Sequence, residues 1–174
     1  RNFKGLLGIL TSPLIHGSWN HVYNNSIALV VLGFYVLQNY HSLYYKLLWY
    51  GTLLTGTWVW ISARESYHIG ASGVVYGMAS FLAFTGFFRR NIRAIAISLV
   101  IVFYYGGMIW GVLPTQEGVS WEGHLLGALV GVFTAYWFRQ RIEEAEIRRK
   151  PSYELEQEEE QYFFPRDIFN RKKE

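Results

Sequence analysis

Five long apolar stretches, joined by links of only a few residues, constrain what this chain can fold into. They cover residues 21–37, 44–61, 72–88, 92–112 and 121–138 of the 174 residues. A helix that crosses the hydrocarbon core of a bilayer needs about 20 mostly apolar residues. An α-helix also bonds its backbone N–H and C=O groups internally, as hydrocarbon requires. The sequence therefore predicts an all-α protein, a polytopic transmembrane helical bundle with five visible spans.

The charged residues divide the chain into unlike parts. Three acidic residues, Glu65, Glu117 and Glu122, precede residue 139, whereas the other ten of the 13 follow it. We therefore expect an outer, membrane-associated loop at residues 1–20, a transmembrane core at 21–138 and a charged tail at 139–174. The net charge of +3 is spread over loops rather than along one stripe, which indicates no nucleic-acid partner. The absence of cysteine excludes disulfides and thiolate metal sites.

Basic residues gather at one set of span ends and predict the orientation. Cytoplasmic loops of membrane proteins carry an excess of Lys and Arg, so this end and the tail at 139–174 should be cytoplasmic. Residues 1–20, 62–69 and 113–120 then lie outside, and Ser120 is a suitable N-cap for the helix from Trp121. Since the chain would begin outside, we expect the first of six spans to precede Arg1. The basic residues concerned are Lys46, Arg89, Arg90, Arg93, Arg139 and Arg141.

Polar side chains recur at a similar depth in three of the predicted spans. Ser72 opens the third span, His124 lies near the start of the fifth, and His21 and Asn25 are one helical turn apart in the first. Ionisable and strongly polar groups are expensive inside a bilayer and mark functional sites there. These residues therefore form the candidate site.

Glycine spacing predicts which spans meet. Gly73 and Gly77 lie four residues apart beside Ser72, and Gly127 and Gly131 repeat this spacing below His124. Small residues four apart let membrane helices approach closely. The third and fifth spans should therefore pack together through these glycines and bring the imidazole of His124 to the hydroxyl of Ser72.

The residue types predict acyl transfer. Ser72 would attack a peptide carbonyl, and His124 would take its proton and return it to the leaving amine. Tyr76, one turn after Ser72, would pack against the imidazole in place of a third triad member. His21 and Asn25 side chains, with the Ser72 backbone N–H, would stabilise the oxyanion. The glycines that flank this serine motif, Gly70 and Gly73, would support the site.

Three motifs follow one another between about Thr11 and Phe138. They are His16-x4-His21-x3-Asn25, Gly70-Ala71-Ser72-Gly73 with Tyr76, and Gly123-His124-x2-Gly127-x3-Gly131. In these motifs and their order the chain resembles the rhomboid intramembrane serine proteases. The resemblance implies a six-helix core with cytoplasmic ends, a Ser72–His124 dyad, an oxyanion-side pair at His21 and Asn25, and a structural histidine at His16. The Trp-Arg pair frequent in the family's outer loop is not seen here.

These observations predict an intramembrane serine endopeptidase that cleaves transmembrane or membrane-proximal segments of single-span membrane proteins. We expect it to work in a lipid bilayer, the bacterial inner membrane, and to need no cofactor and no metal. The alternative is a catalytically inactive rhomboid-like protein that binds and escorts spans. A metalloprotease is disfavoured because no His-Glu-x-x-His motif occurs, and a transporter because the spans show no internal repeat. The pattern does not predict an oligomeric state.

Overall fold

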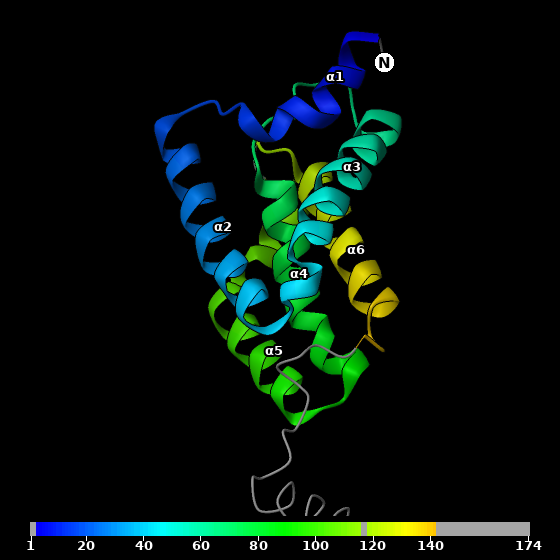
Figure 1. Ribbon diagram of the computed structural model, residues 1–174. Coiled ribbons are helices and arrows are strands. Elements are labelled where there is room, and N and C mark those ends of the chain that lie inside the picture. The colour runs from blue at the N-terminus through cyan, green and yellow to red at the C-terminus, as the bar shows by residue number, and fades with distance from the viewer. Residues whose placement is uncertain (1–2, 116–117, 142–174) are drawn as a thin grey trace, which may run out of the picture. The chain divides into compact units, whose positions relative to one another are not determined.

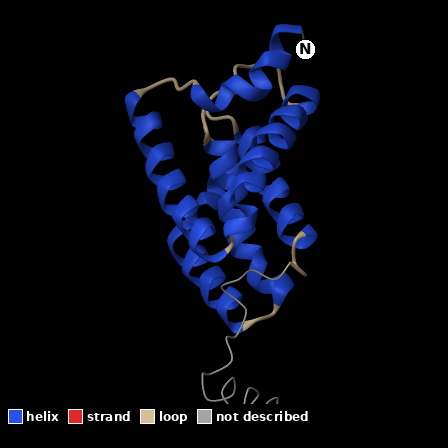
Figure 2. Ribbon diagram, in the orientation of Figure 1, coloured by secondary structure: helices blue, strands red, loops and turns tan. Residues whose placement is uncertain are grey.

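The computed structural model describes residues 3–115 and 118–141, and every regular element within these ranges is helical (Figure 2). The fold class is therefore all-α, as predicted. Beyond Arg141, the predicted tail lies outside the described residues. The elements in chain order are α1 (Phe3–Thr11), η1 (Ser12–Leu14), α2 (Trp19–Asn39), η2 (His41–Leu43), α3 (Tyr44–Ser62), α4 (Ser72–Arg89), α5 (Ile92–Tyr105), η3 (Gly106–Val112) and α6 (Trp121–Trp137).

The five predicted stretches coincide with helical segments to within two residues at each end. Local signals explain two of the starts. Ser18 caps α2 because its side chain accepts a hydrogen bond from the His21 backbone N–H, and Asn91 caps α5 in the same way from Ala94. The start of α2 at Trp19 moves residues 19 and 20 out of the predicted loop and into the helix.

The segment before α2 differs from its prediction as a loop. It contains the nine-residue helix α1 followed by the 3-10 turn η1. The sequence does not indicate this helix because Gly5 and Gly8 weaken a short helix in isolation. Packing compensates, since α1 rests on α3 at Gly56, where a Cβ atom would lie 2.9 Å from the backbone oxygen of Ile9.

The predicted span 92–112 is built from two kinds of helix. Its α-helical part ends at Tyr105, and the chain continues as the 3-10 segment η3 to Val112. The change falls at the Gly106-Gly107 pair, which is consistent with the low helix propensity of glycine. Because a 3-10 helix has a tighter turn than an α-helix, the carbonyl groups of η3 point in other directions than they would in a continued α-helix.

Helix α4 is the central element of the unit that holds residues 1–143 (Figure 1). It packs against α2, α3, α5 and α6, and nine of its 18 residues are buried. Phe81 and Leu82 of α4 belong to the same buried apolar core as Leu32 and Val36 of α2. Ser72 therefore sits at the start of the most enclosed helix of the fold.

Helices α4 and α6 approach each other through their glycines, as the spacing predicted. A Cβ atom at Gly127 would lie 2.9 Å from the carbonyl carbon of Gly73, and one at Gly131 would lie 3.0 Å from the carbonyl carbon of Gly77. Real Cβ atoms do not come this close to a neighbouring backbone. The α4–α6 contact is therefore a backbone-to-backbone contact that only glycine permits.

The predicted basic ends of the helices meet. Arg89, at the end of α4, donates a hydrogen bond to the carbonyl of Arg139, which follows α6. Arg93, at the start of α5, donates to the side-chain oxygen of Asn39 at the end of α2. These contacts confirm that Arg89, Arg93 and Arg139 share one end of the helices, and the assignment of this end to the cytoplasm remains a prediction.

One helical segment of the described chain is both long and apolar enough to cross a membrane by length and composition alone. It is Ile92–Val112, with 21 residues. The helices α2, α3 and α4 have 21, 19 and 18 residues, but polar side chains lower their hydropathy, as His21, Asn24 and Asn25 do in α2. These three helices are therefore long enough to be predicted spans. Among the described helices, the segment 92–112 alone meets both the length and the hydropathy of a span.

The glycine contact predicts a clear effect of Gly127→Ala. The added methyl group would meet the Gly73 backbone, which no rotamer change relieves, so the free energy of unfolding should fall by about 1–3 kcal/mol. Denaturant titration in detergent micelles measures this change. Gly8→Ala in α1 is the matched control, because a Cβ there meets no atom within 4 Å. Equal stability of the two variants would contradict the packing argument.

Candidate functional site

Ser72 and His124 lie side by side, as the glycine spacing predicted. The Ser72 hydroxyl oxygen Oγ is 2.8 Å from His124 Nε2, although 52 residues separate them in sequence. Ser72 is the first residue of α4 and His124 lies in the first turns of α6, and both are half-buried. A hydroxyl within hydrogen-bond reach of an imidazole nitrogen is the arrangement of an activated nucleophile and its base.

The hydrogen-bond partner of His124 Nδ1 determines which imidazole nitrogen carries the hydrogen. His124 Nδ1 lies 2.9 Å from the backbone carbonyl oxygen of Gly111 in η3. A carbonyl can only accept, so Nδ1 must carry the hydrogen. In the neutral ring this leaves Nε2 as an acceptor that faces the Ser72 hydroxyl. The backbone of Gly111 thus selects the tautomer that a general base requires.

The ring of Tyr76 covers one face of the His124 imidazole. The two rings are stacked, with centroids 4.2 Å apart and planes 9° from parallel. The Tyr76 hydroxyl donates a hydrogen bond to the carbonyl oxygen of Met108, also in η3. The predicted contact of Tyr76 with the imidazole is confirmed. The phenol holds the ring plane while Gly111 holds its Nδ1 edge.

The polar side chains of α2 lie against the residue two positions before the serine. A Cβ atom at Gly70 would lie 2.6 Å from the His21 ring and 3.3 Å from Asn25 Nδ2. His16 packs edge-on against His21, with ring centroids 5.0 Å apart. The predicted cluster of His21 and Asn25 with the Gly70–Gly73 segment is therefore present at this end of α4.

Asn25 carries an unused hydrogen-bond donor. It is 7% exposed, and its Nδ2 group has no hydrogen-bond partner among the described residues. An unpaired buried amide is unfavourable by about 1–3 kcal/mol, so each such group calls for an explanation. This unpaired donor lies against Gly70, just before the end of α4 that begins with Ser72.

The sequence does not predict that carbonyl groups of η3 hold the rings of His124 and Tyr76. The carbonyl groups of Gly111 and Met108 belong to the backbone, and no side-chain pattern identifies them. The one local signal in the sequence is the glycine at residue 111. In the structure, a Cβ atom there would lie 3.1 Å from the Tyr76 ring carbon Cζ and 3.3 Å from His124 Nδ1. A glycine at this position lets the 3-10 backbone approach both rings.

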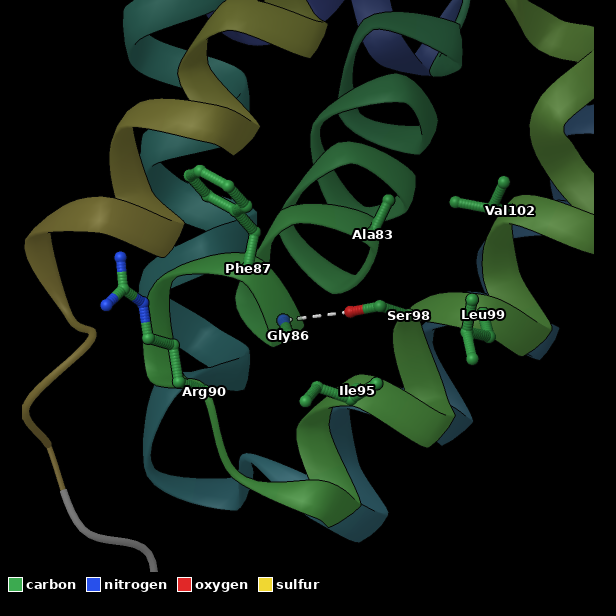
Figure 3. A pocket seen from close by; sticks show the side chains of 8 residues that line it. All are labelled: Ala83, Gly86, Phe87, Arg90, Ile95, Ser98, Leu99 and Val102. Carbon is green, nitrogen blue, oxygen red and sulfur yellow. Dashed lines mark hydrogen bonds between the residues drawn. The ribbon is translucent and has the colours of Figure 1, made fainter.

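A groove of about 410 Å³ lies elsewhere, beside the second half of α4 (Figure 3). Ser98 is one of the residues that line it. The Ser98 hydroxyl accepts a hydrogen bond from the Gly86 backbone N–H and donates one to the Leu82 carbonyl. The Arg90 side chain points away from Ile95 and Leu99 of the opposite wall (Figure 3). The Ser98 hydroxyl is already hydrogen-bonded, and the lining residues do not include Ser72 or His124.

Comparison with known proteins identifies relatives. Residues 4–141 match the Rhomboid domain. The chain is 41% identical over 144 residues to uncharacterized proteins of Mycobacterium tuberculosis and Mycobacterium bovis, covering 76% of this chain and 59% of each relative. It is 36% identical over 143 residues to an uncharacterized protein of Mycobacterium leprae, covering 75% of this chain and 55% of that protein. The chain therefore spans less than two thirds of the length of these relatives. No solved structure matches it significantly.

The environment of Gly70 predicts that Gly70→Ala destabilises the site end of the fold. Gly70 has a φ of +104°, and its Cβ would enter the His21 ring. Gly118 is the matched control, because its φ of +77° is also positive but a Cβ there meets no atom within 4 Å. Both variants should suffer backbone strain of about 1–3 kcal/mol, and Gly70→Ala should lose more on top of it. Thermal unfolding in detergent measures the difference, and a larger loss in Gly118→Ala would refute the packing described here.

Proposed function

This chain belongs to the rhomboid family, a family of intramembrane serine proteases, and we propose that it is itself an active intramembrane serine endopeptidase. The observation that carries this proposal is the 2.8 Å contact between Ser72 Oγ and His124 Nε2. In this contact the imidazole has the tautomer whose Nε2 can accept the serine proton. An inactive, escorting relative would have no need of such a poised pair.

The reaction follows from the positions of these atoms. Ser72 Oγ forms a bond to the carbonyl carbon of the scissile peptide while its proton passes to His124 Nε2. The carbon–nitrogen bond then breaks, and the same proton goes to the leaving amine. Water repeats the sequence: its oxygen attacks the acyl-enzyme, its proton passes through Nε2 to Ser72 Oγ, and the free acid leaves. The proton balance is closed by this chain's own residues and water.

Asn25 supports the proposal from the oxyanion side. Its buried Nδ2 donor is unpaired and lies against Gly70, two residues before the nucleophile. With the His21 side chain and the Ser72 backbone N–H at the start of α4, it would stabilise the tetrahedral oxyanion. Donors that are fixed before the charge develops are worth most, because they need no reorganisation in the transition state.

The partners of the imidazole replace the acid of a triad. Gly111 holds Nδ1 and Tyr76 holds the ring plane, so a neutral backbone group does the orienting that an aspartate performs elsewhere. Because the carbonyl is uncharged, the imidazolium that forms during reaction is stabilised less than by a carboxylate. A slower enzyme than a triad protease is the expected consequence.

The substrates would be single-span membrane proteins. Rhomboid family membership makes this chain a membrane protein, and the first residues of α4 lie at one end of the helices rather than at their middle. A segment cut there must be extended to expose its carbonyl. The mycobacterial relatives favour a bacterial cell membrane, with the basic helix ends and the tail at 139–174 on the cytoplasmic side. The chain would act without a metal or cofactor.

Substitution of either member of the pair should abolish proteolysis. Ser72→Ala removes the nucleophile and His124→Ala removes its base, so cleavage of a reporter span in detergent should fall to background for both. A fluorophosphonate should label the wild type and not Ser72→Ala. Ser66→Ala is the control that should stay active, because Ser66 is an exposed serine in the loop between α3 and α4. Cleavage by Ser72→Ala would overturn the proposal, and substrate binding without labelling of the wild type would favour the escort function.

Asn25→Ala should slow turnover more than it weakens substrate binding. Loss of one oxyanion donor lowers kcat about 10²–10³-fold, while KM should change far less. Asn24→Ala is the matched control, since Asn24 is the exposed neighbour on the same helix. Steady-state kinetics on the reporter span measures both constants. Equal changes in kcat and KM would mean that Asn25 is structural.

A further inference from the structure

A set of side-chain contacts links the segments that precede Ser72 and His124. Arg64 lies in the 63–71 loop, which leads into Ser72. Its Nε is 3.2 Å from Glu122 Oε1, and its Nη2 donates a hydrogen bond of 2.8 Å to the carbonyl of Val119. One guanidinium group therefore holds the chain on both sides of the start of α6.

A second contact runs in parallel. His68 Nδ1 is 2.6 Å from the hydroxyl oxygen of Ser120, and its Nε2 is 3.0 Å from the carbonyl of Arg64. Ser120 is the N-cap residue of α6, as predicted, but its hydroxyl bonds His68 and makes no side-chain capping bond. The polar atoms at the start of α6 are thus directed to the 63–71 loop rather than to their own helix.

The carboxylate at the centre of these contacts is buried. Glu122 is 7% exposed, and its Oε2 has no hydrogen-bond partner among the described residues. A buried carboxylate stays ionised only when a cation compensates it. Arg64 is the cation that contacts it, and Glu122 lies two residues before the base His124. The position of this helical turn therefore depends on a residue of the loop that leads into Ser72.

From these contacts we infer that Arg64 and Glu122, supported by His68 and Ser120, form a clamp that sets the distance between Ser72 and His124. The inference rests on the proposed function, because the distance matters only if the pair is catalytic. Arg64 and Glu122 are positioning residues, since they act through the backbone and touch no reacting atom. The glycine contact brings α4 and α6 together along their length, and the clamp fixes the ends that carry the dyad.

The clamp makes a distinctive prediction about pairs of substitutions. Arg64→Gln leaves a buried carboxylate without its cation, which should displace the start of α6 toward water. A displacement near 1 Å costs about 10²-fold in rate, so kcat and the fluorophosphonate labelling rate should fall about 10–100-fold with KM nearly constant. Glu122→Gln removes the charge and should lose less. The double variant Arg64→Gln/Glu122→Gln should recover part of the loss, because no uncompensated charge remains.

The experiment measures labelling rate, kcat, KM and melting temperature for these three variants and for Arg64→Lys, which keeps the positive charge and should retain most activity. Glu65→Gln is the matched control, since it removes an exposed carboxylate from the same loop. All rates are taken per folded molecule, well below the melting temperature. Rates like wild type in Arg64→Gln, with or without a lower melting temperature, would overturn the clamp while leaving the dyad intact. Failure of the wild type to label would overturn both proposals.

Discussion

The close backbone contact between α4 and α6 is the constraint on which the rest of this structure depends. Two glycines on each helix replace the side chains that would otherwise keep the axes apart, and the Ser72 and His124 side chains meet at one end of this contact. In a membrane, where apolar side chains gain nothing by leaving lipid for protein, such packing is what holds helices together. The packing of the two helices and the contact between Ser72 and His124 therefore both depend on these four glycines.

Much of this arrangement was predictable from the sequence because the relevant signals are carried by side chains. Apolar length located the helices from α2 to α6, and the spacing of Gly73, Gly77, Gly127 and Gly131 identified which two would meet. The stacking of Tyr76 on the imidazole followed from helical periodicity. Each of these inferences uses the identity of a residue and its distance along a regular helix, which are quantities that a sequence contains.

The features that escaped prediction are those in which backbone or tertiary packing decides. The acceptor for His124 Nδ1 is a main-chain carbonyl of Gly111, exposed by the change from α to 3-10 geometry after Tyr105. Helix α1 forms where propensity is low because it rests on α3 at Gly56. The bond of Ser120 to His68 replaces a local cap by a contact across 52 residues. In all three cases, a residue's local preference is outweighed by a neighbour distant in sequence.

The use of a peptide carbonyl to hold the imidazole has an evolutionary consequence. An aspartate in that place can be lost by a single codon change, whereas a carbonyl is present whichever amino acid the codon specifies. Inheritance of this orienting group therefore depends on the path of the main chain from α5 into η3, including the glycine at residue 111, where a Cβ atom would lie 3.3 Å from His124 Nδ1. Divergence that silences such a pair must act on the serine, on the histidine, or on the course of that segment.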